Sequence, residues 1–141
     1  YSRRRNGLVG MSNSRCISFT LGGMFFEYDE EKNKKNIEKH GISFKSAARI
    51  FFDYDRIEFY DEENSIEEDR FDTIGDLSAG QSVMSSKQDT LIGSITKEDV
   101  LFVVYTERVK KLVNGDEVEV TRLISARYAT SFERGLYYGK Y

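Results

Sequence analysis

The 141 residues include a single cysteine, a single histidine and no long apolar run. The lone Cys16 excludes a disulfide framework and a cysteine-based zinc site, and it is typical of a protein kept in a reducing cytosol. A structural metal is not expected, although the carboxylates leave a bound Mg²⁺ open. No segment has the length and hydropathy of a transmembrane helix. We therefore expect a cytoplasmic protein with no cofactor and no membrane contact.

The net charge of −3 is unevenly distributed along the chain. Residues 1–23 carry +4, residues 24–100 carry −9 and residues 101–141 carry +2. The acidic total argues against a general nucleic-acid binder, but it leaves room for a local basic surface. The apolar run near the start is short and interrupted, and no cleavage site follows it. We assign residues 1–23 to a flexible leader and residues 24–141 to a single domain.

Two short helices are predicted near the start of this domain. Asp29 is a favourable N-cap for a helix over residues 30–40, and Gly41 is the residue expected to end it in a left-handed conformation. A second helix is expected to begin at Ser43. Its core-facing side follows the i, i+3, i+4, i+7 spacing through Phe44, Ala47, Ala48 and Phe51.

The remainder of the domain has the two-residue period of strands. Residues 56–60 and 70–74 alternate on either side of an acidic loop at 61–69, and residues 76–99 form a long loop with a short strand expected at 91–95. Two longer runs, 100–113 and 116–126, flank Asn114-Gly115 and predict a β-hairpin with a two-residue type I′ turn. Ser131 is expected to cap a short terminal helix. The pattern predicts an α+β fold with an antiparallel sheet.

The two-residue turn fixes a register for the hairpin. It places Lys110 opposite Glu119, Val109 opposite Val120, and Glu107 opposite Arg122. The face expected to cover the helices then carries Leu101, Val103, Tyr105, Val109, Val120, Ile124 and Ala126. The other face carries Thr106, Arg108, Ser125 and Arg127, together with Phe102, Val104 and Leu123. Such a basic, hydroxyl-bearing patch suits an anionic ligand, and a bulge in either strand would reverse the assignments.

Six short motifs occur in a fixed order along the chain. They are Phe26-Glu27-Tyr28-Asp29, Asn36 to Phe44 with Ala47, Asp69-Arg70, Ile74-Gly75, Val103 to Arg108, and Leu123 to Arg127 with Ala129, Glu133 and Arg134. Residues 24–75 and 101–138, which contain these motifs, resemble the BrnT family, the ribonuclease toxins of BrnT–BrnA type II toxin–antitoxin pairs. Three parts depart from the family pattern: the leader, the longer segment 76–100 and the extended hairpin tip at 109–121.

The resemblance implies a RelE/ParE-like fold, in which two N-terminal helices and a C-terminal helix pack on a twisted antiparallel sheet. It implies an endoribonuclease that cleaves RNA and inhibits translation. It also implies neutralisation by a BrnA-like ribbon-helix-helix antitoxin, so that DNA is contacted only indirectly, through the antitoxin. On this basis the chain is expected to be the toxin component of such a pair.

Metal-independent RNA cleavage needs a base for the 2′-hydroxyl, cations for the phosphorane and an acid for the leaving 5′-oxygen. Arginine suits the second role because its planar fork can hold two phosphate oxygens. We predict a catalytic set of His40, Arg70, Arg108 and Arg127. Three further residues are predicted to bind RNA: Lys39, Arg122 and Arg134.

Five of these residues also have a structural interpretation. Arg108 and Arg127 could only solubilise an exposed face, Arg122 could form a cross-strand ion pair with Glu107, and Arg70 could neutralise nearby acids. His40 in the last turn of a helix interacts favourably with the helix dipole without any catalysis. The alternative function is a non-catalytic module of the same fold that binds a small antitoxin-like partner. Inhibition of a topoisomerase is a third reading, based on fold analogy alone.

Overall fold

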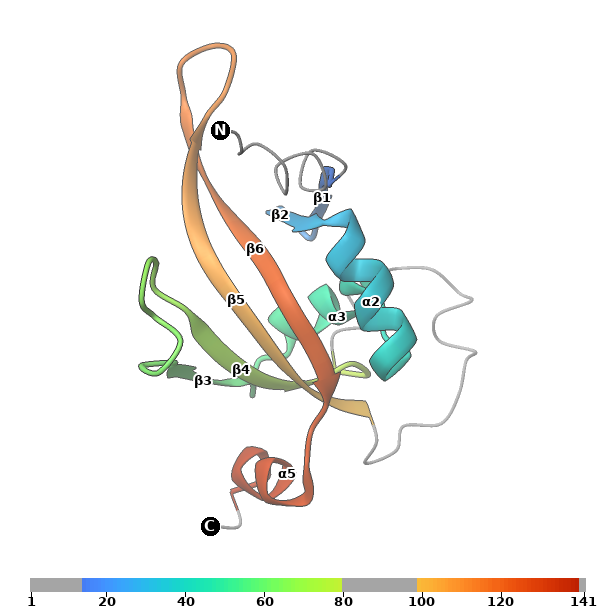
Figure 1. The fold of residues 1–141 in the computed structure, drawn as a ribbon. Coiled ribbons are helices and arrows are strands. Elements are labelled where there is room, and N and C mark those ends of the chain that lie inside the picture. Colours follow the sequence, from blue (N-terminus) through green and yellow to red (C-terminus); the bar gives the residue numbers. More distant parts are fainter. Residues whose placement is uncertain (1–13, 80–98, 140–141) are drawn as a thin grey trace.

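The computed structural model describes residues 14–79 and 99–139, and a six-stranded mixed sheet forms its centre (Figure 1). The strand order is β1-β2-β6-β5-β4-β3. The strands are β1 (Cys16–Leu21), β2 (Met24–Asp29), β3 (Ile57–Tyr60), β4 (Phe71–Asp76), β5 (Val100–Lys111) and β6 (Glu117–Tyr128). All neighbours are antiparallel except β2 and β6, which run parallel. The predicted α+β fold class holds, but the sheet is mixed and not purely antiparallel.

Strand β1 lies within the segment predicted to be a flexible leader. Its residues pair antiparallel with β2, and the connection is a tight turn at Gly22 (φ 56°) and Gly23 (φ 84°). Two successive positive φ angles are the signature of a type I′ hairpin turn. Alternate side chains, Ile17, Phe19 and Leu21, pack against the core. The leader prediction does not hold for these residues, and residues 1–13 lie outside the described part of the chain.

Helix α2 (Glu30–His40) has the caps expected from the sequence. The Asp29 carboxylate accepts a hydrogen bond from the Lys32 N–H at 2.9 Å, and Gly41 ends the helix with φ 74°. Ser43 caps α3 (Phe44–Ala47), which continues as the 3₁₀ helix η1 (Ala48–Phe52). These helices follow two strands along the chain, so they do not stand at the start of the domain as expected.

The sheet has two unlike faces, which we call the helix face and the open face. On the helix face, side chains of β2, β5 and β6 share one buried cluster with residues of α3 and η1, including Phe26, Tyr105, Phe44 and Ile50. Helix α5 (Ser131–Tyr137) lies at one end of the sheet (Figure 1). There Tyr137 packs with Ile74 and Phe102 on the open face. Its N-cap is Thr130, one residue before the predicted Ser131.

Buried Asn36 fixes α2 to the sheet. Its Nδ2 donates to the carbonyl oxygens of Ile42 (2.9 Å) and Ala126 (2.8 Å), and its Oδ1 accepts from the Ala126 N–H at 3.1 Å. A buried amide with three such partners is satisfied and holds its element in one position. This contact places the C-terminal end of α2 beside the end of β6.

Gly75 in β4 marks a close approach between the sheet and η1. A Cβ atom at this position would lie 3.0 Å from Ile50 Cβ and 3.2 Å from Arg56 Cβ. Contacts of this length are tighter than most real Cβ contacts, so a side chain at this position would push η1 away by a few tenths of an ångström. The Ile74-Gly75 motif therefore has a packing role, because glycine lets η1 sit this close to the strand.

The hairpin register differs from the prediction over its outer half. Glu107 faces Thr121, Arg108 faces Val120 and Lys110 faces Val118. The loop has three residues closed at Leu112 and Asp116, with Gly115 at φ 94°, instead of the predicted two-residue turn. A bulge at Val104/Tyr105 restores the predicted register beyond it. The shift moves Leu123 to the helix face and Val120 to the open face, and it removes the expected Glu107–Arg122 pair.

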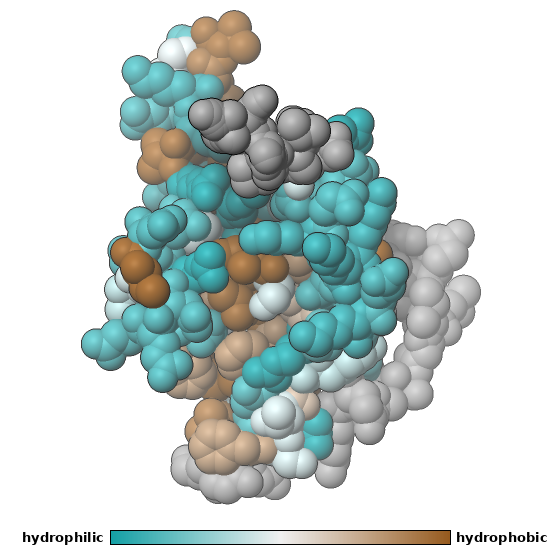
Figure 2. Space-filling view, in the orientation of Figure 1, coloured by the Kyte–Doolittle hydropathy of each residue, from teal (hydrophilic) through white to brown (hydrophobic). Residues whose placement is uncertain are grey.

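The surface shown in Figure 2 is mostly hydrophilic over α2, while hydrophobic side chains are exposed at the tip of the β5–β6 hairpin, where Leu112 and Val113 lie. The tip projects beyond the other strands (Figure 1). Among residues 14–79 and 99–139, no helix combines the length and hydropathy required to cross a membrane.

Candidate functional site

Glu27 is the centre of the most highly organised polar group on the open face. Its neighbours in β2, Phe26 and Tyr28, point into the core on the helix face, so the alternation of the strand turns Glu27 to the open face. The parallel β2–β6 pairing sets Glu27 opposite Arg122. The Glu27 side chain has 0% exposure. A carboxylate this buried requires partners that compensate its charge.

Three cations supply that compensation. Arg122 Nη1 lies 3.0 Å and Arg108 Nη1 lies 3.6 Å from Glu27 Oε2, and Lys110 Nζ donates to Oε1. Burial opposes ionisation of Glu27, but the hydrogen bonds from Lys110 and Arg122 outweigh it and hold the pKa of Glu27 below its usual range. We call Glu27, Arg108, Lys110 and Arg122 the Glu27 cluster.

The cations of the Glu27 cluster remain accessible to solvent. The Arg108 and Lys110 side chains are 40% and 46% exposed, and Arg122 is 21% exposed. At the rim, Arg108 Nη2 also contacts the Glu68 carboxylate at 3.2 Å. Three cations fixed by one buried acid retain donors for a second anion. The arrangement is suited to binding a phosphodiester.

Arg127 lies on the same face but in a different place. Its guanidinium makes two hydrogen bonds to the Glu133 carboxylate of α5, at 2.8 and 2.9 Å, and lies 4.2 Å from the centre of the Phe102 ring. Arg134 donates to the carbonyl of Ala129 at 2.9 Å. Both arginines therefore attach α5 to the end of the sheet. Both guanidinium groups already have partners within the protein, a carboxylate for Arg127 and a carbonyl oxygen for Arg134.

His40 and Lys39 lie at the C-terminal end of α2. Burial lowers the pKa of His40, and the charges of Lys39 and Arg127 lower it further. His40 is therefore within electrostatic reach of Arg127 and belongs to the α5 end of the molecule. Arg70 is at a third place, where it lines a pocket with the loop residues Asn64, Ile66, Glu67 and Glu68.

The structure thus divides the seven predicted residues among three places. Arg108 and Arg122 come together at the Glu27 cluster, whereas the α5 end holds Lys39, His40, Arg127 and Arg134. Arg108 faces Val120, seven residues before Arg127 on β6. At ~3.3 Å per residue the two arginines are separated by roughly 20 Å along the strand. They therefore cannot hold one phosphodiester together, although they lie on the same face as predicted.

Three residues of interest were missed from the sequence. Two of them, Glu27 and Lys110, complete the Glu27 cluster. The sequence does carry a signal for Glu27, because it is a carboxylate between two residues that face the core. The third is Asp72 on β4, which shares the open face with its partner Val104. Burial and a hydrogen bond to Asp61 raise the pKa of Asp72 to about 7. Within the described residues no group of three or more His, Cys, Asp or Glu side chains is arranged to hold a metal.

The raised pKa of Asp72 predicts a pH-dependent cost to stability. The folded carboxyl holds its proton up to about pH 7, whereas an unfolded aspartate releases it near pH 3.9. Stability from this group therefore falls as the pH rises between these values. Asp72→Asn should raise the free energy of unfolding by roughly 1–2 kcal/mol at pH 8, and by less at pH 5, after allowance for partial exposure.

Thermal unfolding of the wild type and Asp72→Asn at pH 5 and pH 8 measures this difference. Glu63→Gln, on the exposed part of the 61–69 loop, is the matched control. It should change the free energy of unfolding by no more than about 0.5 kcal/mol at either pH. An equal gain at both pH values would show that Asp72 is not protonated in the folded protein.

The motifs found in the sequence were compared with known protein families. Residues 28–86 match the family model described as "Ribonuclease toxin, BrnT, of type II toxin-antitoxin system". The match covers α2, α3, η1, β3 and β4, while β5 and β6, which carry Arg108, Arg122 and Arg127, lie beyond it. No curated protein matches the chain. The resemblance is confirmed for this part of the chain: residues 28–86 carry the signature of the BrnT ribonuclease toxins of type II toxin–antitoxin systems.

Proposed function

We propose that this protein is an endoribonuclease with a RelE/ParE-like fold, that it acts in the cytoplasm as the toxin of a type II pair, and that it cleaves RNA at the Glu27 cluster. The observation that carries the proposal is the convergence of Arg108, Lys110 and Arg122 on one buried carboxylate. The family match to a ribonuclease toxin supports RNA as the anion. Inhibition of translation would follow from the loss of intact RNA.

The reaction assigned to this site is an internal transfer within the RNA. The 2′-oxygen attacks the adjacent phosphorus, the bond to the 5′-oxygen breaks, and the products are a 2′,3′-cyclic phosphate and a 5′-hydroxyl. Arg108 and Arg122 stabilise the charge on the phosphorane. Glu68, which forms an ion pair with Arg108 at the rim of the cluster, accepts the 2′-proton in this scheme. The Lys110 ammonium donates a proton to the leaving oxygen.

Glu27 acts as a positioning residue in this scheme. This residue has 0% exposure, and its carboxylate orients all three cations. The α5 end has a supporting role. The α5-end residues His40, Lys39, Arg127 and Arg134 are proposed as RNA contacts outside the reacting phosphate, because Arg127 lies roughly 20 Å from Arg108 along the sheet. Arg70, which lines a pocket with Glu68, is proposed as a further RNA contact at the rim.

The test is incubation of the purified protein with a single-stranded RNA in EDTA. We expect fragments that end in a 2′,3′-cyclic phosphate and begin with a 5′-hydroxyl. The same sequence with 2′-O-methyl groups should stay intact, because it lacks the nucleophile. RNA that remains whole at stoichiometric protein, together with normal growth on induction, would remove the enzyme assignment and leave the non-catalytic partner-binding module.

We propose a BrnA-like ribbon-helix-helix protein as the antitoxin, so that DNA is reached only through it. The specific observation is the exposed apolar hairpin tip, with Val109, Leu112 and Val113 open to solvent. Such a patch on a small protein is typical of a partner interface. Co-expression with a small ribbon-helix-helix protein encoded beside the toxin should restore growth and yield a co-purifying complex. Separate elution of the two proteins would contradict this assignment.

A further inference from the structure

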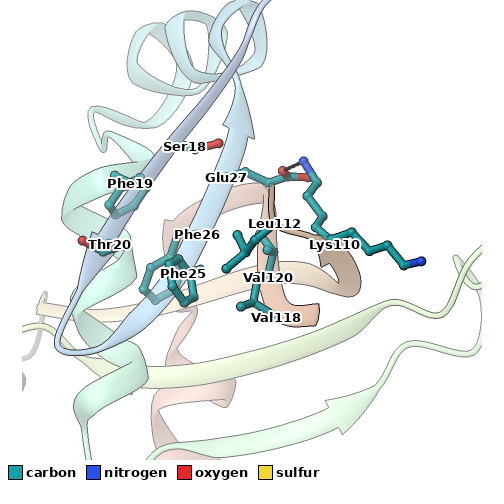
Figure 3. A pocket seen from close by; sticks show the side chains of 11 residues that line it. Ser18, Phe19, Thr20, Phe25, Phe26, Glu27, Lys110, Leu112, Val118 and Val120 are labelled. Carbon is teal, nitrogen blue, oxygen red and sulfur yellow. Dashed lines mark hydrogen bonds and ion pairs between the residues drawn. The ribbon is translucent and has the colours of Figure 1, made fainter. Parts of the chain in front are cut away.

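A pocket of about 410 Å³ adjoins the Glu27 cluster on the open face. Its lining comes from β1, β2, β5 and β6, and it contains Phe25, Val118, Val120, Leu112, Ser18 and Lys110. Figure 3 shows Phe25 beside Val120, with the Glu27–Lys110 pair at the edge of the group. The volume lies near the lower end of the range for small-ligand sites, about 300–1,000 Å³. The pocket is therefore of a size for one small ligand.

The pocket has an apolar floor and a cationic edge. Val120 faces the open side opposite Arg108, and Phe25 is its partner across the parallel pair. The Phe25 side chain is 39% exposed, so part of its ring is available to a ligand. Lys110 belongs both to this pocket and to the Glu27 cluster. A ligand in the pocket would consequently lie next to an anion bound by the cations.

A ligand with a flat apolar face joined to an anionic group matches this arrangement. Single-stranded RNA supplies such a unit in every nucleotide, and proteins bind its unstacked bases on aromatic side chains. The Ser18 hydroxyl, on the strand beside Glu27, offers a hydrogen-bonding group for a base edge. We propose that this pocket binds one nucleobase of the RNA, stacked on Phe25, beside the phosphate held by the Glu27 cluster. The inference rests on the proposed function.

The test uses RNA that binds without being cleaved. A fluorescein-labelled 2′-O-methyl hexanucleotide and an abasic oligomer with the same backbone are titrated with protein, and fluorescence anisotropy gives the Kd. Phe25→Ala should weaken binding of the base-bearing oligomer about tenfold, since stacking on an aromatic ring contributes this order of affinity. Binding of the abasic oligomer should not change. Phe25→Tyr should restore the affinity, while Phe25→Leu should not.

Two further variants separate this inference from the function on which it rests. Phe59→Ala removes an equally exposed phenylalanine (42%) on β3, outside the pocket, and should leave both Kd values unchanged. Arg108→Ala should weaken both oligomers alike. If Phe25→Ala behaves like Phe59→Ala while Arg108→Ala still weakens binding, the base pocket is wrong and the phosphate site stands. If the wild type binds neither oligomer, both proposals fail.

Discussion

Replacing Arg122 with alanine should slow RNA cleavage by about 100-fold or more while the protein stays folded. The guanidinium is held 3.0 Å from buried Glu27 and is the least exposed of the three cations, so it is the best fixed for transition-state charge. Removing one such preorganised donor from an active site costs about 10²–10³ in rate. Single-turnover cleavage of a labelled RNA measures the effect.

Two companion variants make the Arg122 experiment specific. Arg122→Lys keeps the charge but loses the planar fork, and it should recover only part of the rate. Lys34→Ala removes an exposed α2 lysine that forms an ion pair with Glu31 at 3.6 Å, and it should cleave at the wild-type rate. A fully active Arg122→Ala protein would show that the Glu27 cluster is a structural ion network.

Phe44→Ala should lower the free energy of unfolding by about 3–5 kcal/mol. Phe44 has 0% exposure at the first turn of α3, and its ring meets Tyr28 edge-on at 5.6 Å. Truncation removes this contact and leaves a cavity between the helices and β2. Urea denaturation followed by circular dichroism gives the change, and the Tm should fall by roughly 10 °C or more.

Phe59→Ala provides the comparison for Phe44 as well. It deletes the same side chain at a position with 42% exposure, so the loss should stay below about 1 kcal/mol. Similar losses from the two variants would mean that α3 does not pack on the sheet as described.

Local signals were sufficient for α2 and α3. Asp29, Gly41 and Ser43 act over a few residues, and their roles follow from backbone groups within the same turn. The core stripe through Phe44, Ala47, Ala48 and Phe51 is buried as its spacing predicts. Strand β1 also had a local signal, because Ile17, Phe19 and Leu21 alternate before Gly22-Gly23.

Non-local pairing could not be inferred in the same way. Nothing near Phe25 or Glu27 in the sequence specifies β6 as a parallel neighbour, because partner choice depends on the assembled sheet. The hairpin register depended on the turn and on a bulge at Val104/Tyr105. A one-residue shift exchanges the faces of a strand. This shift explains why Arg122 pairs with Glu27 and not with Glu107. Arg108 and Arg127 do share the predicted face, but Arg127 faces Phe102, six residues from Arg108 along β5, so a shared face did not make them neighbours.

The parallel pair also has a consequence during synthesis. Glu27 and Arg122 are separated by 95 positions in the chain, so the ribosome adds the glutamate well before the arginine. A nascent polypeptide that has not yet reached this arginine holds its glutamate without the guanidinium that completes the group. If this group is the toxic centre, a nascent chain becomes active only after β6 has been made and has paired with β2.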